Sequence, residues 1–211
     1  MLDTQSLYKI LFSHMGSQHW WPAESKIEVI LGAILVQNTN WRNAAYALEQ
    51  LKVKTEFDPE QILNLKLESL QTIIKSSGFY KNKARTILNI LAWLERFDFD
   101  YQTVKSYYQH QLRNALLEVK GIGSETADVL LVYIFEEVAF IPDSYTRRIY
   151  KKLGYANTES YEKLKQYIQL PETFTNADAN EFHALLDNFG KNYFNGKNEK
   201  KYTFLDTYFE K

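Results

Sequence analysis

The chain has 211 residues, enough for one domain or for two small domains that share a cleft. Apolar residues make up 45% of it, which is enough for a substantial core, and only eight glycines and four prolines are present, which favours helices over a turn-rich β fold. The absence of cysteine excludes disulfides, thiolate metal sites and cysteine nucleophiles, and suits a cytoplasmic protein. Neither a signal peptide nor a membrane-spanning run is predicted, and a formal net charge of −1 does not by itself indicate nucleic-acid binding.

Apolar residues recur at helical spacing along most of the chain, and no convincing β alternation or internal repeat is found. The first helix is expected over residues 1–19, before Trp20-Trp21-Pro22, since proline closes one element and can open the next. A second helix, over 25–36, leads into the polar stretch Gln37-Asn38-Thr39. Further helices are expected over 42–51, from 58 onward, over 69–76, 82–95, 103–118 and 127–135, from 143 onward, and over 160–168 and 177–189. The sequence therefore predicts an all-α fold.

Between two of these helices lies the segment Gly121-Ile122-Gly123-Ser124. Two glycines permit positive φ and leave backbone N–H groups uncovered, and Ser124 is a good N-cap for the helix that follows. The pattern predicts a helical hairpin whose free amides can bind an anion such as a phosphate. Gly-x-Gly alone is a weak signal, because many helical hairpins turn on glycine.

A second helix start, Pro142-Asp143-Ser144, follows downstream with an acidic residue at its mouth. Together, residues 119–127 (VKGIGSETA) and 142–148 (PDSYTRR) resemble the endonuclease III-like branch of the helix-hairpin-helix DNA glycosylase superfamily. The resemblance extends to Gln37-Asn38-Thr39 and to residues 77–84 (SGFYKNKA), and covers roughly residues 20 to 195.

The resemblance implies two helical domains. Residues 22–137 are expected to form a six-helix barrel that carries the hairpin, and residues 1–21 with 138–211 a terminal domain that carries Asp143. The active site is expected in the cleft between them. The implied substrate is double-stranded DNA that contains a damaged base, bound by a monomer with no membrane contact.

Asp143 is the expected catalytic residue. Breaking an N-glycosidic bond builds positive charge on the deoxyribose, which a carboxylate near C1′ stabilises, and the same carboxylate can orient or deprotonate the attacking water. A helix N-terminus should lower the pKa of this carboxyl group and keep it ionised. The alternative is a plain N-cap aspartate, which would be the usual reading without the hairpin upstream.

The resemblance also assigns the hairpin residues. The amides of Gly121, Gly123 and Glu125 are expected to hold a phosphate beside the target nucleotide, and Lys120 to contact another. Relatives often bind a monovalent cation through hairpin carbonyls, so a Na⁺ or K⁺ ion is expected at the carbonyls of Leu117, Val119 and Ile122.

Glu125 stands where bifunctional relatives carry a catalytic lysine, and a carboxylate cannot form a Schiff base. This departure favours an enzyme that uses water and does not cut the strand, although the nearby Lys120 could substitute for the lysine. Ala33 stands where adenine-specific relatives carry a glutamate acid, which disfavours that specificity.

Gln37 and Phe79 align with residues that enter the DNA stack in relatives. Phe79 could fill the gap left by a flipped base, and Gln37 could bond the orphaned partner base. The alternatives are a buried phenylalanine and an amide that caps a helix C-terminus. The region 69–94 has no acidic residue, and we expect its basic residues, Lys83 included, to contact DNA; these residues are Lys75, Lys81, Lys83 and Arg85. A solvated helix face is the alternative.

Trp20, Trp21 and Trp41 are the specificity clue, because indole rings can stack on a flipped base and attract a cationic one by about 0.5–2 kcal/mol. Adjacent residues rarely face the same way, so Trp21 is preferred over Trp20 as a pocket residue; all three could instead be core residues. The Trp-Trp-Pro sequence, the missing lysine and the cysteine-free tail resemble the 3-methyladenine glycosylases related to endonuclease III.

No cofactor is expected to be required. Many relatives bind an iron–sulfur cluster through four cysteines near the C-terminus, which this chain lacks. The tail could replace the cluster by packing and phosphate contacts, or could simply be solvated; its basic and aromatic residues are Lys191, Lys197, Lys200, Lys201, Tyr193, Phe194 and Tyr202. The four histidines show no metal spacing, and His183 is expected in the core or between the domains, although a pocket role stays open.

The sequence therefore predicts a monofunctional DNA glycosylase that hydrolyses the glycosidic bond of alkylated purines such as 3-methyladenine. A glycosylase for damaged or mismatched pyrimidines is the first alternative. The second is a non-catalytic DNA-binding helical module, and the third is a plain all-α interaction domain.

Overall fold

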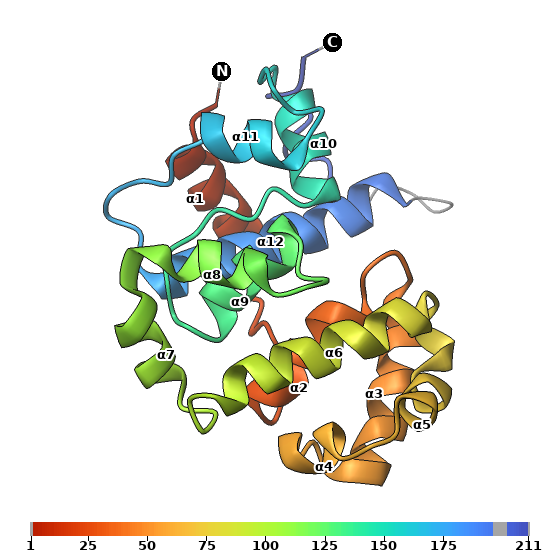
Figure 1. Ribbon diagram of the computed structural model, residues 1–211. Helices are drawn as coiled ribbons and strands as arrows, with labels where there is room; N and C mark the ends of the chain where they lie inside the picture. Colours follow the sequence, from red (N-terminus) through yellow and green to blue (C-terminus); the bar gives the residue numbers. More distant parts are fainter. Residues whose placement is uncertain (1, 196–201, 211) are drawn as a thin grey trace. The chain divides into compact units, whose positions relative to one another are not determined.

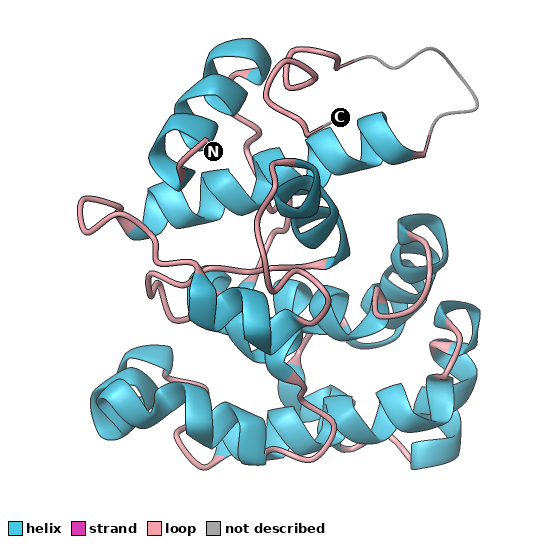
Figure 2. Cartoon of the chain, turned by 90° about the horizontal axis from the view of Figure 1, so that it is seen from above, coloured by secondary structure: helices cyan, strands magenta, loops and turns pink. Residues whose placement is uncertain are grey.

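The computed structural model describes residues 2–195 and 202–210, and every regular element in these ranges is a helix (Figures 1 and 2). The all-α prediction is confirmed. The chain divides into two compact units: residues 1–22 with 136–211, here named the terminal unit, and residues 23–135, the central unit. The domain boundaries expected near residues 22 and 137 lie within two residues of the points where these units divide. That the two units are the barrel and terminal domains of the family stays a prediction.

The terminal unit is built on one long helix, α12 (Asn176–Phe194), against which α1 (Thr4–Met15) and α10 (Ser144–Lys152) pack; α11 (Tyr161–Tyr167) completes it. Gly190 on α12 faces Tyr145 on α10 so closely that a Cβ atom would collide with the tyrosine. The buried core of the unit, which includes Leu7, Tyr150 and Phe189, joins all four helices to Leu205 in the tail.

The central unit is built around α2 (Lys26–Leu35), in which every residue from Ile27 to Leu35 except Glu28 is buried. A helix that is apolar on all sides is stable only inside a core, and α3, α6 and α9 pack around it. The remaining helices complete the unit in this chain order: α3 (Trp41–Thr55), α4 (Pro59–Leu63), α5 (Leu67–Ile73), η1 (Lys75–Ser77), α6 (Tyr80–Glu95), α7 (Tyr101–Tyr108), η2 (Gln109–Gln111), α8 (Leu112–Glu118) and α9 (Ser124–Tyr133).

The prediction of a single helix over residues 103–118 is wrong. The chain breaks at Gln109, which has a φ of 47°, and α7 and α8 are separate helices. The ring of Tyr108 stacks on that of Trp93 with 5.4 Å between centroids, and its hydroxyl accepts from Arg96. Both partners belong to α6, so the break coincides with the point where α7 is held against α6.

An ion pair with one buried partner joins the two helices of the hairpin. Arg113 on α8 donates two hydrogen bonds, of 2.9 and 3.2 Å, to the carboxylate of Asp128 on α9, which is completely buried. Paired donors on a planar guanidinium match the two carboxylate oxygens, so this contact fixes orientation as well as distance.

Replacing Arg113 with methionine should lower the free energy of unfolding by about 3 kcal/mol or more, because a buried carboxylate then loses its cation. Chemical denaturation of Arg113→Met measures the loss. Arg96→Met is the control, since the hydrogen bond of Arg96 to Tyr108 is exposed and a change below about 1 kcal/mol is expected. Equal stability of the two variants would contradict the proposed importance of the pair.

Candidate functional site in the terminal unit and the hairpin

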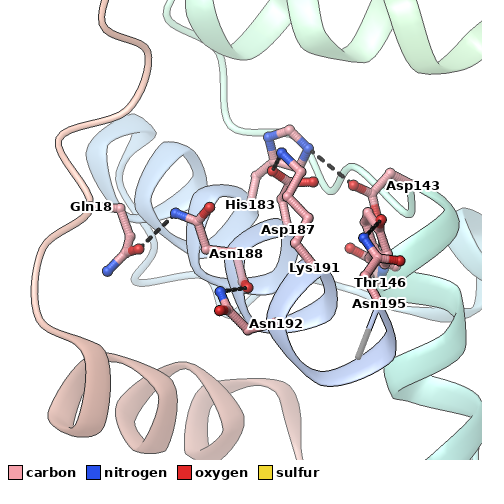
Figure 3. A network of polar contacts seen from close by, with 10 residues as sticks. Gln18, Asp143, Thr146, His183, Asp187, Asn188, Lys191, Asn192 and Asn195 are labelled. Carbon is pink, nitrogen blue, oxygen red and sulfur yellow. Dashed lines mark hydrogen bonds and ion pairs between the residues drawn. The ribbon is translucent and has the colours of Figure 1, made fainter. Parts of the chain in front are cut away.

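Asp143 is the N-cap of α10, as the sequence predicts. One carboxylate oxygen, Oδ1, accepts a 2.7 Å hydrogen bond from the Thr146 amide, and the other, Oδ2, lies 3.7 Å from Nε2 of His183 on α12 (Figure 3). The residue is only 9% exposed. A carboxylate is therefore held in a largely buried place, between a helix N-terminus and an imidazole.

The pKa of Asp143 lies below its usual value, the direction predicted from the sequence. Burial alone would raise this pKa, but the contact with His183 and the amide and hydroxyl of Thr146 lower it by more. The start of α10 is thus one of two causes that lower this pKa, and the larger of the two is the contact with the His183 imidazole. Asp143 is ionised at neutral pH.

His183 begins a row of ionisable side chains along one face of α12. Asp187 lies one turn further and Lys191 another turn beyond, where its ammonium donates to the Asp187 carboxylate (Figure 3). Burial raises the pKa of Asp187, and the negative charge of Asp143 raises it further. Sequence reasoning left the role of His183 open and missed Asp187, although the four-residue spacing of His183, Asp187 and Lys191 inside a predicted helix was the available signal.

Trp20 lies beside this row. The Lys191 ammonium is 5.3 Å from the centroid of the Trp20 ring, and the ring of Trp21 is tilted by 53° against it. The indole N–H of Trp20 is buried and has no hydrogen-bond partner among the described residues. Trp41 is the first residue of α3 in the central unit and is 39% exposed, which excludes the core alternative for this tryptophan. The convergence of the three rings on one base stays a prediction.

The hairpin forms as predicted, with one correction. Gly121 has a φ of 102°, whereas Gly123 has an ordinary φ of −96° and is itself the N-cap of α9, in place of Ser124. A Cβ atom on Gly121 would collide with Thr86 of α6, but one on Gly123 would meet nothing within 4 Å. Gly121 is therefore required by the turn, and Gly123 leaves open space in front of the first amides of α9.

At this turn, where a cation site is expected, only backbone carbonyl groups are placed to bind a cation. Val119 leaves the helical conformation, with a ψ of 116°, and its carbonyl accepts from Ile122 across the turn at 2.9 Å. Carbonyl oxygens have two lone pairs, so this bond does not prevent a further contact. No cluster of His, Asp or Glu in the described residues could hold a metal ion, and a Na⁺ or K⁺ ion at the carbonyls of Leu117, Val119 and Ile122 stays a prediction.

Substituting alanine at the two glycines should separate folding from anion binding. Gly121→Ala should lose about 2–4 kcal/mol of stability, from the positive φ together with the collision with Thr86. Gly123→Ala should change stability by less than about 1 kcal/mol but weaken DNA binding, since its methyl group would stand before the amides. Thermal melts and fluorescence anisotropy measure the two effects; a stable Gly121→Ala protein would contradict the assigned strain.

Glu125 lies in the first turn of α9, where a negative charge is favoured by the helix dipole. The side-chain amide of Gln37 donates to it at 3.4 Å and to the carbonyl of Ala33 at 3.3 Å. The second bond fits the alternative given above for Gln37, an amide that caps the end of α2. Its contact with a partner base stays a prediction.

Phe79 is 68% exposed and has a φ of 48° as the N-cap of α6. The alternative of a buried phenylalanine is wrong. A large apolar ring is instead presented to solvent on a non-glycine residue in the left-handed region, which is uncommon and has an energetic cost. This placement fits the expected wedge, which stays a prediction.

Lys83 does not belong to the basic surface. It is 6% exposed, and its ammonium donates to the carbonyls of Leu35 at 2.8 Å and Ser77 at 2.6 Å. Burial lowers its pKa to about 8. The expectation that Lys83 contacts DNA is wrong, because its side chain closes the C-terminal end of α2 against η1; Lys81 and Arg85, on either side of it, are exposed.

Lys83→Met should therefore lower the free energy of unfolding by about 1–3 kcal/mol, since two buried carbonyls lose their donor. Lys81→Met is the matched control, a surface lysine whose loss should leave stability within about 0.5 kcal/mol and reduce the salt dependence of DNA binding. Denaturation curves and salt titrations of both variants make the comparison. A weaker salt slope in a stable Lys83→Met protein would restore the original prediction.

The described part of the tail packs against the terminal unit, while its expected phosphate contacts and its replacement of a cluster stay predictions. Tyr193 stacks on Phe189 with 5.3 Å between ring centroids, and the Arg148 guanidinium lies 3.8 Å from the centre of the Phe194 ring. Tyr202 stacks on Phe189 as well. The remaining basic residues of that expectation, Lys197, Lys200 and Lys201, lie outside the described residues.

Comparison with known proteins decides the family. The HhH-GPD superfamily of base excision DNA repair proteins matches residues 31–172. The chain belongs to this superfamily. It is 36% identical over 185 residues to a protein of Methanocaldococcus jannaschii that is provisionally named a DNA repair glycosylase, with 85% of this chain and 83% of that protein covered. It is 28% identical to the endonuclease III of Sulfolobus acidocaldarius, over 77% of this chain and 71% of the relative.

Solved structures agree with these relatives. The H. pylori 3-methyladenine DNA glycosylase MagIII, bound to 1,N6-ethenoadenine, superposes with a TM-score of 0.75 at 28% identity, over 90% of this chain and 98% of that one. A trapped endonuclease III–DNA intermediate shares the fold, with a TM-score of 0.72 at 21% identity, over 94% of this chain and 91% of that one. The chain is therefore a DNA glycosylase of the HhH-GPD base excision repair superfamily. None of its described helices has the length and apolar character needed to cross a membrane.

Proposed function

We propose that this glycosylase is monofunctional and releases alkylated purines, such as 3-methyladenine, from double-stranded DNA by hydrolysis. The observation that carries the proposal is the ionised, largely buried carboxylate of Asp143 at the start of α10. A fixed negative charge in a place with little water stabilises a developing sugar cation far more than a solvated one would.

The chemistry follows from this charge. The bond between C1′ and the base nitrogen breaks with its electron pair going to the base, and the Asp143 carboxylate offsets the positive charge left on the sugar. Water then bonds to C1′ and gives up one proton, either to the Asp143 carboxylate or to the solvent. Because Asp143 already accepts from the Thr146 amide, its carboxylate is held in place before the reaction.

The absence of strand cleavage is proposed from Glu125. A Schiff base needs an amine at the attacking position, and the first turn of α9 offers a carboxylate instead. Water that attacks beside Asp143 is therefore the proposed nucleophile, and the nearby Lys120 is the alternative source of an amine.

The substrate class is proposed from the tryptophans and from a relative. Trp20 and Trp21 lie in the same unit as Asp143, and the charge of Lys191 against Trp20 is balanced by Asp187, so it does not oppose a cationic base. N3- and N7-alkylated purines are cationic and leave without prior protonation. The similarity to the H. pylori enzyme, which is named a 3-methyladenine glycosylase, supports this class.

The DNA contacts are proposed at several surfaces. The amides of Gly121, Gly123 and Glu125 would hold a phosphate, Lys120 another, and exposed Phe79 would enter the base stack. No cofactor is proposed to be required, and a Na⁺ or K⁺ ion is proposed at the hairpin carbonyls. The protein is proposed to act as a monomer in the cytoplasm, where its substrate DNA lies.

A pyrimidine specificity is the second candidate function. It is favoured by two relatives named endonuclease III, which are each 28% identical to this chain over 77% and 68% of it, against 36% identity for the first relative. The choice of substrate in the test below separates the two candidates.

The test is release of free base from methylated duplex DNA, followed by chromatography, and from duplexes with a single damaged pyrimidine. The wild type should release 3-methyladenine and leave strands that break only after alkali. Asp143→Asn should lower the rate by about 100-fold or more without weakening DNA binding. Release of pyrimidines alone would favour the second candidate, and strand breaks without alkali would refute the monofunctional assignment.

A further inference from the structure

Two segments of the central unit that are proposed to contact the DNA stack are not fixed by their own residues. Phe79 has a φ of 48° and follows Gly78, which has a φ of 65°, and no side chain caps the first turn of α6. Gln37 lies just before Asn38, whose φ is 53°. Non-glycine residues hold a left-handed conformation only where the surrounding structure imposes it. Contacts from elsewhere in the fold are therefore needed to hold both segments.

Lys83 supplies such a contact to both segments at once. Its ammonium donates to the carbonyls of Leu35 and Ser77, at 2.8 and 2.6 Å. The first carbonyl lies two residues before Gln37, and the second lies two residues before Phe79. Both belong to the last residue of a helix, α2 or η1, where carbonyls lack intrahelical partners and a positive charge is favoured. Burial lowers the pKa of Lys83 to about 8, which leaves the amine mostly charged at neutral pH and both bonds charge-assisted.

Ser76 makes a second connection between the same segments. Its hydroxyl donates at 3.1 Å to the carbonyl of Asn43 in the first turn of α3, against which η1 packs. The side-chain amide of Asn43 donates in turn to the hydroxyl of Thr39 at 3.3 Å, in the loop that follows Gln37. The turn that carries Phe79 is thus joined at two points to the loop that carries Gln37.

We propose that Lys83, supported by Ser76, is a positioning residue for base flipping, which holds the turn of Phe79 and the loop of Gln37 at a fixed spacing before DNA is bound. This inference rests on the proposed function, in which the Phe79 ring enters the base stack, and on the expected contact of Gln37 with the partner base. Lys83 is 6% exposed, so it acts on the DNA only through the two side chains that it positions.

A fixed spacing matters because the gap left by a flipped base must be filled by the protein. Two segments that moved independently would each have to be ordered on binding, and that ordering would weaken the complex with flipped DNA. A pair that Lys83 already holds in place avoids this loss. Phosphate contacts to an intact duplex do not depend on the spacing, so the effect of Lys83 is confined to DNA with a displaced or missing base.

The test compares two dissociation constants, for an intact duplex and for the same duplex with a tetrahydrofuran abasic-site analogue, by fluorescence anisotropy at one salt concentration. The analogue carries no base, so the result does not depend on which base the enzyme releases. The wild type should prefer the analogue. Lys83→Met should reduce this preference about 10-fold and leave the affinity for intact duplex within about 2-fold. Lys54→Met, at an exposed lysine of α3, is the matched control and should keep the wild-type preference.

A double-mutant cycle distinguishes positioning from a contribution to stability alone. Phe79→Ala should also reduce the preference about 10-fold. If Lys83 acts through Phe79, the double variant should lose about 20-fold or less, whereas independent effects would multiply to about 100-fold. A lysine that only stabilised the fold would leave the preference of the folded protein unchanged.

The outcomes separate the inference from the proposed function. An unchanged preference in folded Lys83→Met, or a loss that multiplies fully with that of Phe79→Ala, overturns the inference alone. If thermal melts show that Lys83→Met does not fold, Ser76→Ala replaces it in the cycle with an expected loss of about 3-fold, and no loss there overturns the inference as well. Equal binding of both duplexes by the wild type would refute the proposed role of Phe79 together with the inference, while the release of methylated purines tests the substrate class separately.

Discussion

A negative charge held almost out of reach of water at the start of α10 is the constraint on which the terminal unit depends. Removing a carboxylate from water is costly unless hydrogen bonds and an opposite charge compensate for it. Asp143 has two such partners, the Thr146 amide and the imidazole of His183, which belongs to a helix more than 30 positions away in the chain. The two helices must therefore meet closely, and Gly190 against Tyr145 permits that approach.

The hairpin depends on two positions that have no side chain, each for a different reason. Gly121 lacks a side chain because α6 occupies the space, with Thr86 against the turn and Asn89 donating to the Lys120 carbonyl. Gly123 lacks one in front of open space. The first glycine is required by the fold, the second leaves the first amides of α9 uncovered, and the partly buried Arg113–Asp128 pair joins the two helices of the hairpin.

Much of this could be predicted from the sequence. Local signals, such as the cap at Asp143, the turn at Gly121 and the apolar run of α2, depend on residues close together in the chain, and the predictions made from them agree with the structure. The failures concern contacts between distant segments. Lys83 reads as a surface cation because its nearest neighbours are basic, yet its partners are carbonyls at Leu35 and Ser77; the break at Gln109 depends on α6. The contact of His183 with Asp143 likewise arises only where α12 meets α10.

The buried ammonium of Lys83 has a consequence for how opening of the central unit could be observed. An amine whose pKa is near 8 holds a sizeable fraction of its neutral, nucleophilic form near physiological pH, yet here it is covered and engaged with two carbonyls. Acylating reagents can reach it only when α2, η1 and the start of α6 separate. The rate at which Lys83 becomes acylated, compared with that of exposed Lys81, would thus measure how often this part of the central unit opens. The opening would occur four residues after Phe79 in the sequence.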